Sequence, residues 1–233
     1  MKYNVIPVTP LQQNCTLISC EETGKAAVVD PGGELDRIIA AAKELGVEID
    51  KILLTHAHID HAGGAGELSR RLKLPIEGPH KEDMFWIQAL PEQSKAFGLP
   101  PAETFEPERW LEQGDEVLVG NSRLEVRHCP GHTPGHVIFF QASDRVALVG
   151  DVLFRGSIGR TDFPRSDHEQ LLESIRSQLF SLGDEVEFIS GHGPLSTIGH
   201  ELNTNPFLSR YYLGNRNACN SRLLCFSSGL RIE

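Results

Sequence analysis

Residues 55–61 read THAHIDH, and this stretch determines the class of fold and chemistry that we expect for the chain. It places His56, His58, Asp60 and His61 directly after the apolar run KILL. No single face of a helix or a strand holds all four side chains, because adjacent residues and residues two apart point in different directions on a helix. A loop wrapped around metal ions accounts for the cluster, since imidazole and carboxylate groups are ligands of zinc, iron and manganese.

Three loops further along the chain repeat the pattern of an apolar strand followed by a histidine or an aspartate. LEVRHC leads to His132, VALVG leads to Asp151, and EFIS leads to His192. Loops that follow strand ends gather at one edge of a sheet, where α/β folds place their sites. We therefore expect these three side chains to converge with residues 55–61.

Seven ligands are too many for one tetrahedral ion, and they suit two ions that share a carboxylate and a water. The seven divide into a first set, a second set and a bridging residue: His56, His58 and His132; Asp60, His61 and His192; and Asp151. Two ions about 3.5–4 Å apart lower the pKa of a shared water, so the expected nucleophile is a bridging hydroxide. We expect two Zn²⁺ per chain, and iron or manganese is also compatible with these ligands.

Strand-like and helix-like stretches alternate along the chain in two similar halves. Residues 35–45 have helical spacing and Gly46 follows as a C-terminal cap, while Ser166 opens another helix with a capping box completed by Glu169. Strands that form hairpins, mixed with such helices, predict an α/β fold of two sheets with helices packed outside.

Residues 80–107 are rich in Pro, Glu and Gln and are the hardest part of the sequence to interpret. The pattern does not decide whether they form a lid. Their large apolar side chains either line a wall of the site or pack as plain core beneath a loop: Met84, Phe85, Trp86 and Phe97.

Composition limits the functional classes and the setting. The chain has 233 residues, a net charge of −10 and no apolar stretch near the roughly 20 residues of a membrane span, which argues against nucleic acid or membrane as a partner. Five scattered cysteines and the lack of a secretory signal favour the cytoplasm. We expect one domain over residues 1–208, a monomer, and a disordered or vector-derived tail over residues 209–233.

The other histidines and one further aspartate receive ordinary structural interpretations. Four histidines lack the company of other metal-capable residues in the sequence: His80, His128, His168 and His200. We expect His136 to support the loop at residues 133–135. Asp30 ends a strand and is expected to be mainly structural, with a second possible role of orienting a ligand histidine.

Together, THAHIDH, PGHTPGH, VGDVLF and SGHGP resemble the motifs of the metallo-β-lactamase superfamily, and the likeness spans residues 1 to about 208. The resemblance implies an αββα sandwich, in which two mixed β-sheets lie back to back with helices outside. It implies the same division of ligands between two metals. It also implies that Asp60 is a ligand of the second metal with a role in handling the proton of the bridging hydroxide.

Finer motifs narrow the resemblance. SIGRTDFP (157–164), GHGPLSTIGHE (191–201) and NPFL (205–208) look like the glyoxalase II group in its short bacterial form. This implies a hydrolase that converts S-D-lactoylglutathione to D-lactate and glutathione, with Asp60 and Asp151 as catalytic residues. Longer members bind glutathione through basic residues in a C-terminal helical region that this chain does not match. Arg160 is a candidate for binding the anionic end of the substrate, and an ion pair with Asp162 is the alternative.

A second family resemblance gives a different reaction. Persulfide dioxygenases share the fold and a GRTDF segment, and they use one iron. In this sequence the iron ligands would be His56, His132 and Asp151, with oxygen as cosubstrate. One iron per chain would indicate the dioxygenase, and two ions would indicate the hydrolase.

Overall fold

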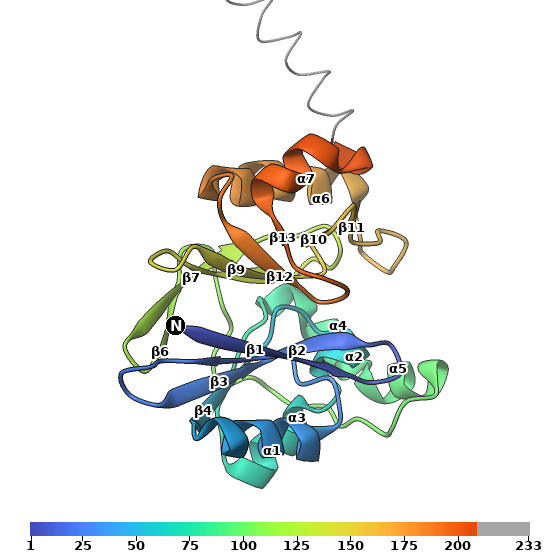
Figure 1. Cartoon of the computed structure of the whole chain (residues 1–233). Coiled ribbons are helices and arrows are strands. Elements are labelled where there is room, and N and C mark those ends of the chain that lie inside the picture. The colour runs from blue at the N-terminus through green and yellow to red at the C-terminus, as the bar shows by residue number, and fades with distance from the viewer. Residues whose placement is uncertain (209–233) are drawn as a thin grey trace, which may run out of the picture.

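Two β-sheets lie face to face with helices on both outer sides (Figure 1). The computed structural model describes residues 1–208, so the predicted tail at residues 209–233 lies outside the described residues. This is the αββα sandwich expected from the sequence, and the predicted fold class is confirmed.

The first sheet is built from the N-terminal part of the chain in the order β1-β2-β3-β4-β5. Its strands are β1 (Lys2–Val8), β2 (Gln13–Ser19), β3 (Lys25–Val29), β4 (Glu48–Leu53) and β5 (Ile76–Glu77). The first three strands are antiparallel, and β3, β4 and β5 are parallel because helices connect them. The sheet is therefore mixed, and the loop that follows β4 lies at the edge formed by the ends of the strands.

The second sheet has the order β13-β12-β9-β8-β7-β6. Its strands are β6 (Glu116–Val119), β7 (Ser122–His128), β8 (Val137–Gln141), β9 (Val146–Gly150), β12 (Glu187–Ser190) and β13 (Ser196–Thr197). Strands β6 to β9 form antiparallel hairpins, whereas β12 pairs in parallel with β9. A separate short hairpin joins β10 (Leu153–Phe154) and β11 (Ser157–Ile158).

Alternation along the strands divides the apolar side chains among three layers of core. Phe139 faces the first sheet, where it packs in one cluster with Ile18 and Leu53. Its neighbour Phe140 faces the opposite way, toward the helices that cover the second sheet. Successive residues of a strand point to opposite faces, so one strand serves two cores.

The helices fall into two groups (Figure 1). Those of the first half are α1 (Leu35–Leu45), α2 (Ile59–Ala62), α3 (Ala65–Leu72), α4 (Met84–Gln88) and α5 (Leu90–Phe97). Those of the second half are α6 (His168–Ser174) and α7 (Ile198–Thr204), with a π-helical turn at Ile175–Leu179 after α6. None of the helices within residues 1–208 has the length and apolar character needed to cross a bilayer.

The cap of α1 is confirmed, and the cap of α6 is corrected. Gly46 ends α1 in the left-handed conformation with φ of 67°. Asp167, rather than the predicted Ser166, is the N-cap of α6, because its carboxylate accepts a hydrogen bond from the Gln170 amide. The Ser166 hydroxyl instead donates to the carbonyl of His132 at 2.7 Å, which ties the start of α6 to the site.

Candidate metal centre

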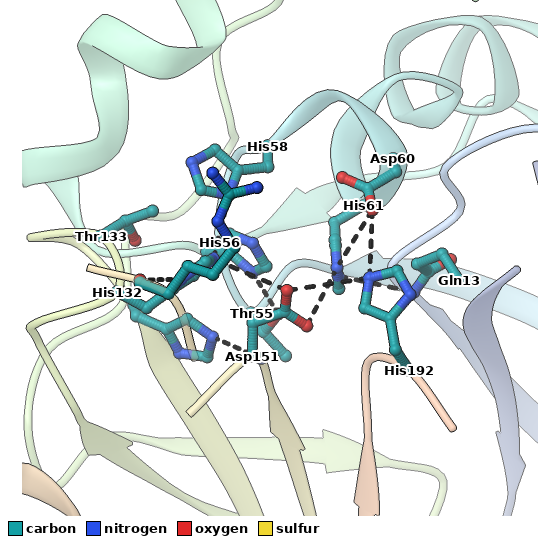
Figure 2. Close-up of polar contacts among 12 residues, drawn as sticks. Gln13, Thr55, His56, His58, Asp60, His61, His132, Thr133, Asp151 and His192 are labelled. Carbon is teal, nitrogen blue, oxygen red and sulfur yellow. Dashed lines mark hydrogen bonds and ion pairs between the residues drawn. The ribbon is translucent and has the colours of Figure 1, made fainter. Parts of the chain in front are cut away.

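The four loops that the sequence singled out meet at one edge of the two sheets (Figure 2). Residues 55–61 follow β4, His132 follows β7, Asp151 follows β9 and His192 follows β12. All seven predicted ligands lie in this one cluster, and six of them are buried, whereas the His192 side chain is 30% exposed.

The cluster contains two separate groups of three potential ligands, and a third group, Asp30, His56 and His61, overlaps both of them. Within each group the offered nitrogen or oxygen atoms all lie within 4.8 Å of one another. The two separate groups are His56, His58 and His132, and Asp60, His61 and His192. This is the same division that counting ligands in the sequence predicts, and the role of each residue as a ligand stays a prediction.

Asp151 lies between the two groups. Its Oδ1 is 3.3 Å from Nε2 of His61, and its Oδ2 is 3.6 Å from Nε2 of His132 and 3.7 Å from Nε2 of His192 (Figure 2). A carboxylate that faces both groups in this way has the position that a bridging ligand requires.

Buried polar atoms without a partner test whether the cluster fits metal ions. Nε2 of His56 and of His58 is buried without a hydrogen-bond partner, and Nε2 of His61 and Oδ1 of Asp151 are buried with no hydrogen-bond partner beyond their mutual ion pair at 3.3 Å. Leaving several such atoms unsatisfied is costly, and each is an atom type that coordinates divalent metals. The donor set, with nitrogen and carboxylate oxygen and no cysteine, therefore fits zinc, iron or manganese.

The first ligand group and Asp151 favour the protonation states of metal ligands, whereas Asp60 and Asp151 raise the pKa of His61 and His192. Burial, reinforced by neighbouring imidazoles, lowers the pKa of His56 well below its usual range, and burial also lowers the pKa of His58 and His132. Burial opposes ionisation of Asp151, but His61 and then His132 hold the pKa of this carboxyl far below its usual range. Neutral imidazoles and an ionised carboxylate are the forms that bind metal.

His61 is oriented by a network that reaches back to β3. Its Nδ1 lies 2.9 Å from Oδ2 of Asp30, which also accepts a hydrogen bond from the Thr55 hydroxyl at 2.6 Å. Oδ1 of Asp30 accepts from the Thr55 amide at 2.7 Å. Asp30 thus turns Nε2 of His61 toward the cluster, which agrees with the second role expected for it.

His136 contacts the cluster directly, although the sequence suggested only a loop-supporting role. The Asp151 backbone N–H donates to Nε2 of His136 at 3.0 Å, and the His136 ring stacks on the His56 ring with centroids 4.6 Å apart. His136 therefore holds the backbone of the bridging residue and one face of a ligand. The sequence motif did not indicate these contacts of His136, because they join residues of separate strands.

Asp83 is the residue that sequence reasoning missed. This fully buried carboxylate accepts hydrogen bonds from the Ala57 amide at 3.1 Å, the Thr133 hydroxyl at 2.8 Å and the Gly135 amide at 2.6 Å. Ala57 lies between two ligands of the first group, and Thr133 follows the third. Asp83 therefore joins the two loops of that group, and burial raises its pKa to about 7.

A cleft of about 360 Å³ opens onto the cluster. Its walls are mostly apolar side chains from four separate segments: Leu11, Ile59, Trp86, Phe97, Phe154 and Phe163. Trp86 and Phe97 thus line the site, whereas Met84 and Phe85 border a different hollow. The segment at residues 80–107 supplies one wall of the cleft.

Arg160 lines the cleft and is also paired. Its guanidinium donates to both carboxylate oxygens of Asp162 at 2.9 and 2.7 Å and lies 4.7 Å from the ring centre of Phe163. The ion pair that the sequence offered as the alternative is present. Arg160 is the only arginine or lysine that lines this cleft among residues 1–208.

Two of the remaining histidines meet in space although they lack metal-capable neighbours in the sequence. His80 and His128 stack with ring centroids 4.3 Å apart. With Glu82 they form a further group of potential ligands outside the cleft. Their proximity depends on tertiary structure alone, since β7 brings His128 to the loop that contains His80.

The fold and the paired ligand groups define a class of metal-dependent hydrolases. A model of the metallo-beta-lactamase superfamily matches residues 8–192, and the chain belongs to this superfamily. A relative described as hydroxyacylglutathione hydrolase GloC, from Haemophilus influenzae, is 47% identical over 210 residues, which are 90% of this chain and 99% of that protein. These findings support a hydrolase that uses a divalent metal.

Two solved structures show the same fold. The crystal structure of BLEG-1 B3 metallo-beta-lactamase is 35% identical, with a TM-score of 0.82 over 89% of this chain and 99% of that one. The crystal structure of TTHA1623 in a di-iron-bound form is 38% identical, with a TM-score of 0.80 over 88% of this chain and 100% of that one.

Proposed function

We propose that this protein is a thioesterase that hydrolyses S-D-lactoylglutathione to D-lactate and glutathione with the help of two Zn²⁺ ions. The observation that carries the proposal is the position of Asp151 between two complete ligand groups, which supports a dinuclear hydrolase. The 47% identity to GloC of Haemophilus influenzae supports a hydroxyacylglutathione as the substrate.

Each ligand group has one task in this proposal. His56, His58 and His132 would hold the first ion, Asp60, His61 and His192 would hold the second, and Asp151, which faces both groups, would serve both. Two ions at this position supply a water of lowered pKa and a Lewis acid for the thioester carbonyl.

The residues of the chain then direct the reaction. The carboxylate of Asp151 keeps the two groups at a fixed spacing, and Asp60, whose Oδ2 is 3.1 Å from Nε2 of His192, takes up a proton during turnover. Water contributes its hydroxyl group to the acyl carbon, the carbon–sulfur bond breaks, and sulfur leaves with the bonding electrons and is protonated to the thiol. The apolar walls, including Trp86 and Phe163, limit the access of bulk water.

Hydrolysis of S-D-lactoylglutathione by the zinc-loaded protein tests the proposal, with the Asp151→Ala variant measured beside it. We expect turnover within the ordinary enzyme range of about 1–10³ s⁻¹ for the wild type, and loss of both turnover and bound metal in Asp151→Ala. Asp36→Ala is the control, because this side chain is 88% exposed and should leave both unchanged. Full activity of Asp151→Ala would contradict the proposal.

Persulfide oxidation is the second candidate, because the GRTDF segment borders the ligands. The carbonyl of Arg160 is 2.8 Å from Nδ1 of His132, and Phe163 of the same segment lines the cleft. This reaction would use one iron held by His56, His132 and Asp151. The dioxygenase would be favoured by one iron per chain, by consumption of oxygen together with a glutathione persulfide, and by no cleavage of the thioester.

Hydrolysis of a cephalosporin should be measured beside these reactions because of the likeness to BLEG-1.

A further inference from the structure

A second cluster of metal-capable side chains lies outside the cleft. His80 precedes the 3₁₀ turn at Lys81–Asp83, Glu82 lies in that turn, and His128 ends β7. Each offers one ligand atom, and these atoms all lie within 4.8 Å of one another, which is the same spacing that defines the two groups of the metal centre. Ligand atoms around a tetrahedral zinc ion with bonds of about 2.0–2.1 Å lie about 3.3–3.4 Å apart, so binding would draw these atoms together by up to about 1.5 Å. The two rings are stacked with their planes 23° apart, so one ring would also turn its lone pair toward the ion.

Hydrogen bonds at the far nitrogens leave Nδ1 of both rings able to bind. Nε2 of His128 is 2.8 Å from the Pro134 carbonyl, which can only accept, so Nε2 of the neutral ring carries the proton and Nδ1 the lone pair. Nε2 of His80 is 3.0 Å from the carboxylate of Glu112, with the same consequence. Ligand histidines in metal sites usually donate their other N–H to a carbonyl or a carboxylate in this way.

The surroundings of the cluster favour a cation. The His80 side chain is only 15% exposed, and Glu82 and Glu112 place two carboxylates beside the imidazoles. Burial lowers the pKa of His128, which keeps its ring neutral. The one interaction that an ion at Nδ1 of His80 would replace is a hydrogen bond from the Glu82 amide, which is long at 3.3 Å.

We propose that His80, Glu82 and His128 form an additional binding site for a divalent transition-metal ion, separate from the active-site clusters. Nδ1 of each histidine and the Glu82 carboxylate are the ligands, and Glu112 and the Pro134 carbonyl orient the rings. Two nitrogens and one carboxylate suit Zn²⁺, with water completing the tetrahedron. An ion here would join the end of β7 to the turn that carries Asp83.

Equilibrium dialysis against Zn²⁺, followed by elemental analysis, tests this site in the intact protein. Glu82→Gln and His128→Gln should each bind one Zn²⁺ fewer per chain than the wild type. Glu106→Gln is the matched control, because Glu106 is exposed and takes no part in the cluster, and it should bind as much zinc as the wild type. The result is a difference between proteins, so it does not depend on how many ions the cleft holds.

Thermal unfolding gives a second readout. Added Zn²⁺ should raise the Tm of the wild type further than that of Glu82→Gln, because an ion that binds only the folded state stabilises it. Glu82 is exposed, so this variant keeps the fold even where His128→Gln disturbs the packing of the half-buried ring. Equal zinc content and an equal Tm response in wild type and Glu82→Gln would overturn the proposal.

Discussion

Gly191 shows how little space the ligand cluster leaves around itself. A Cβ atom at this position would lie 2.1 Å from Oδ1 of Asp151 and 2.5 Å from Cε1 of His61. The backbone cannot easily move away, because the Gly191 carbonyl accepts from the Asn14 amide at 2.7 Å and its amide donates to the carbonyl of Gly150 at 2.8 Å. The absence of a side chain here is therefore a condition for the bridging geometry.

We predict that Gly191→Ala loses bound metal and activity, because the added methyl group displaces Asp151 and His61. Gly193→Ala is the control: with φ of 76° and no heavy atom within 4 Å, it should lose only about 1–2 kcal/mol of unfolding free energy and keep its metal. Metal content after dialysis and urea unfolding distinguish the two effects. Equal metal content in both variants would show that the methyl group is accommodated.

The sequence indicated the members of the cluster better than it indicated the residues that hold them in place. His56, His58, Asp60 and His61 lie in one motif, so their chemistry is visible without a fold. The contacts of Asp83 join three segments that are distant in the chain, and no local pattern marks it.

Among the elements, the helical segment from Lys81 to Phe97 connects the cleft wall to the metal centre. Its first turn carries Asp83, whose hydrogen bonds join the two loops that contribute the first ligand group. Trp86, which forms part of the cleft wall, lies with its ring centre 4.6 Å from that of His58. The sequence did not predict α4 and α5, because Pro and a short length obscure their periodicity.

We predict that Asp83→Asn weakens metal binding or activity by about 10–100-fold, the usual effect of removing a group that orients ligands. An amide has one acceptor oxygen, so its NH₂ group would face at least one of the three donors. Chelator competition measures the metal affinity.

Glu201→Gln is the control for Asp83→Asn, since Glu201 is also fully buried and accepts from the Gly156 amide and the Asn205 side chain, away from the ligands. Both variants should lose stability, and only Asp83→Asn should lose metal affinity. Equal metal affinities in the two variants would mean that Asp83 contributes to packing alone.

At the scale of the whole molecule, contacts between the two sheets place one half of the ligands against the other. The Asn14 side chain, in β2, donates to the carbonyl of Ser190 at the end of β12 and to the carbonyl of Gly193 in the loop that follows. The Tyr3 hydroxyl, in β1, donates to Glu187 in β12 at 2.5 Å. The two-sheet architecture was predictable from alternating patterns, but these cross-sheet pairs depend on how the sheets pack.

We predict that Tyr3 makes stability depend on pH in the alkaline range. Its hydrogen bond to Glu187, with burial, raises the pKa of Tyr3 to about 12, against about 10 in an unfolded chain. The folded state then holds the proton more tightly, so the contribution is complete below about pH 10 and is lost as pH rises toward about 12.

Urea unfolding of wild type and Tyr3→Phe across this range measures the contribution. The wild type should be the more stable protein at about pH 9, and the difference should shrink toward about pH 12. A difference that does not change with pH would mean that the hydrogen bond does not bias the protonation of Tyr3.

The distribution of the ligands along the chain has a consequence for biosynthesis. Because synthesis runs from the N-terminus, His56, His58, Asp60 and His61 are made before β8 to β12 exist. Neither ligand group is complete at that stage, because one needs His132 and the other needs His192. Under the proposed function, a full metal complement requires that translation has passed residue 192, so bound metal would distinguish a finished domain from a truncated one.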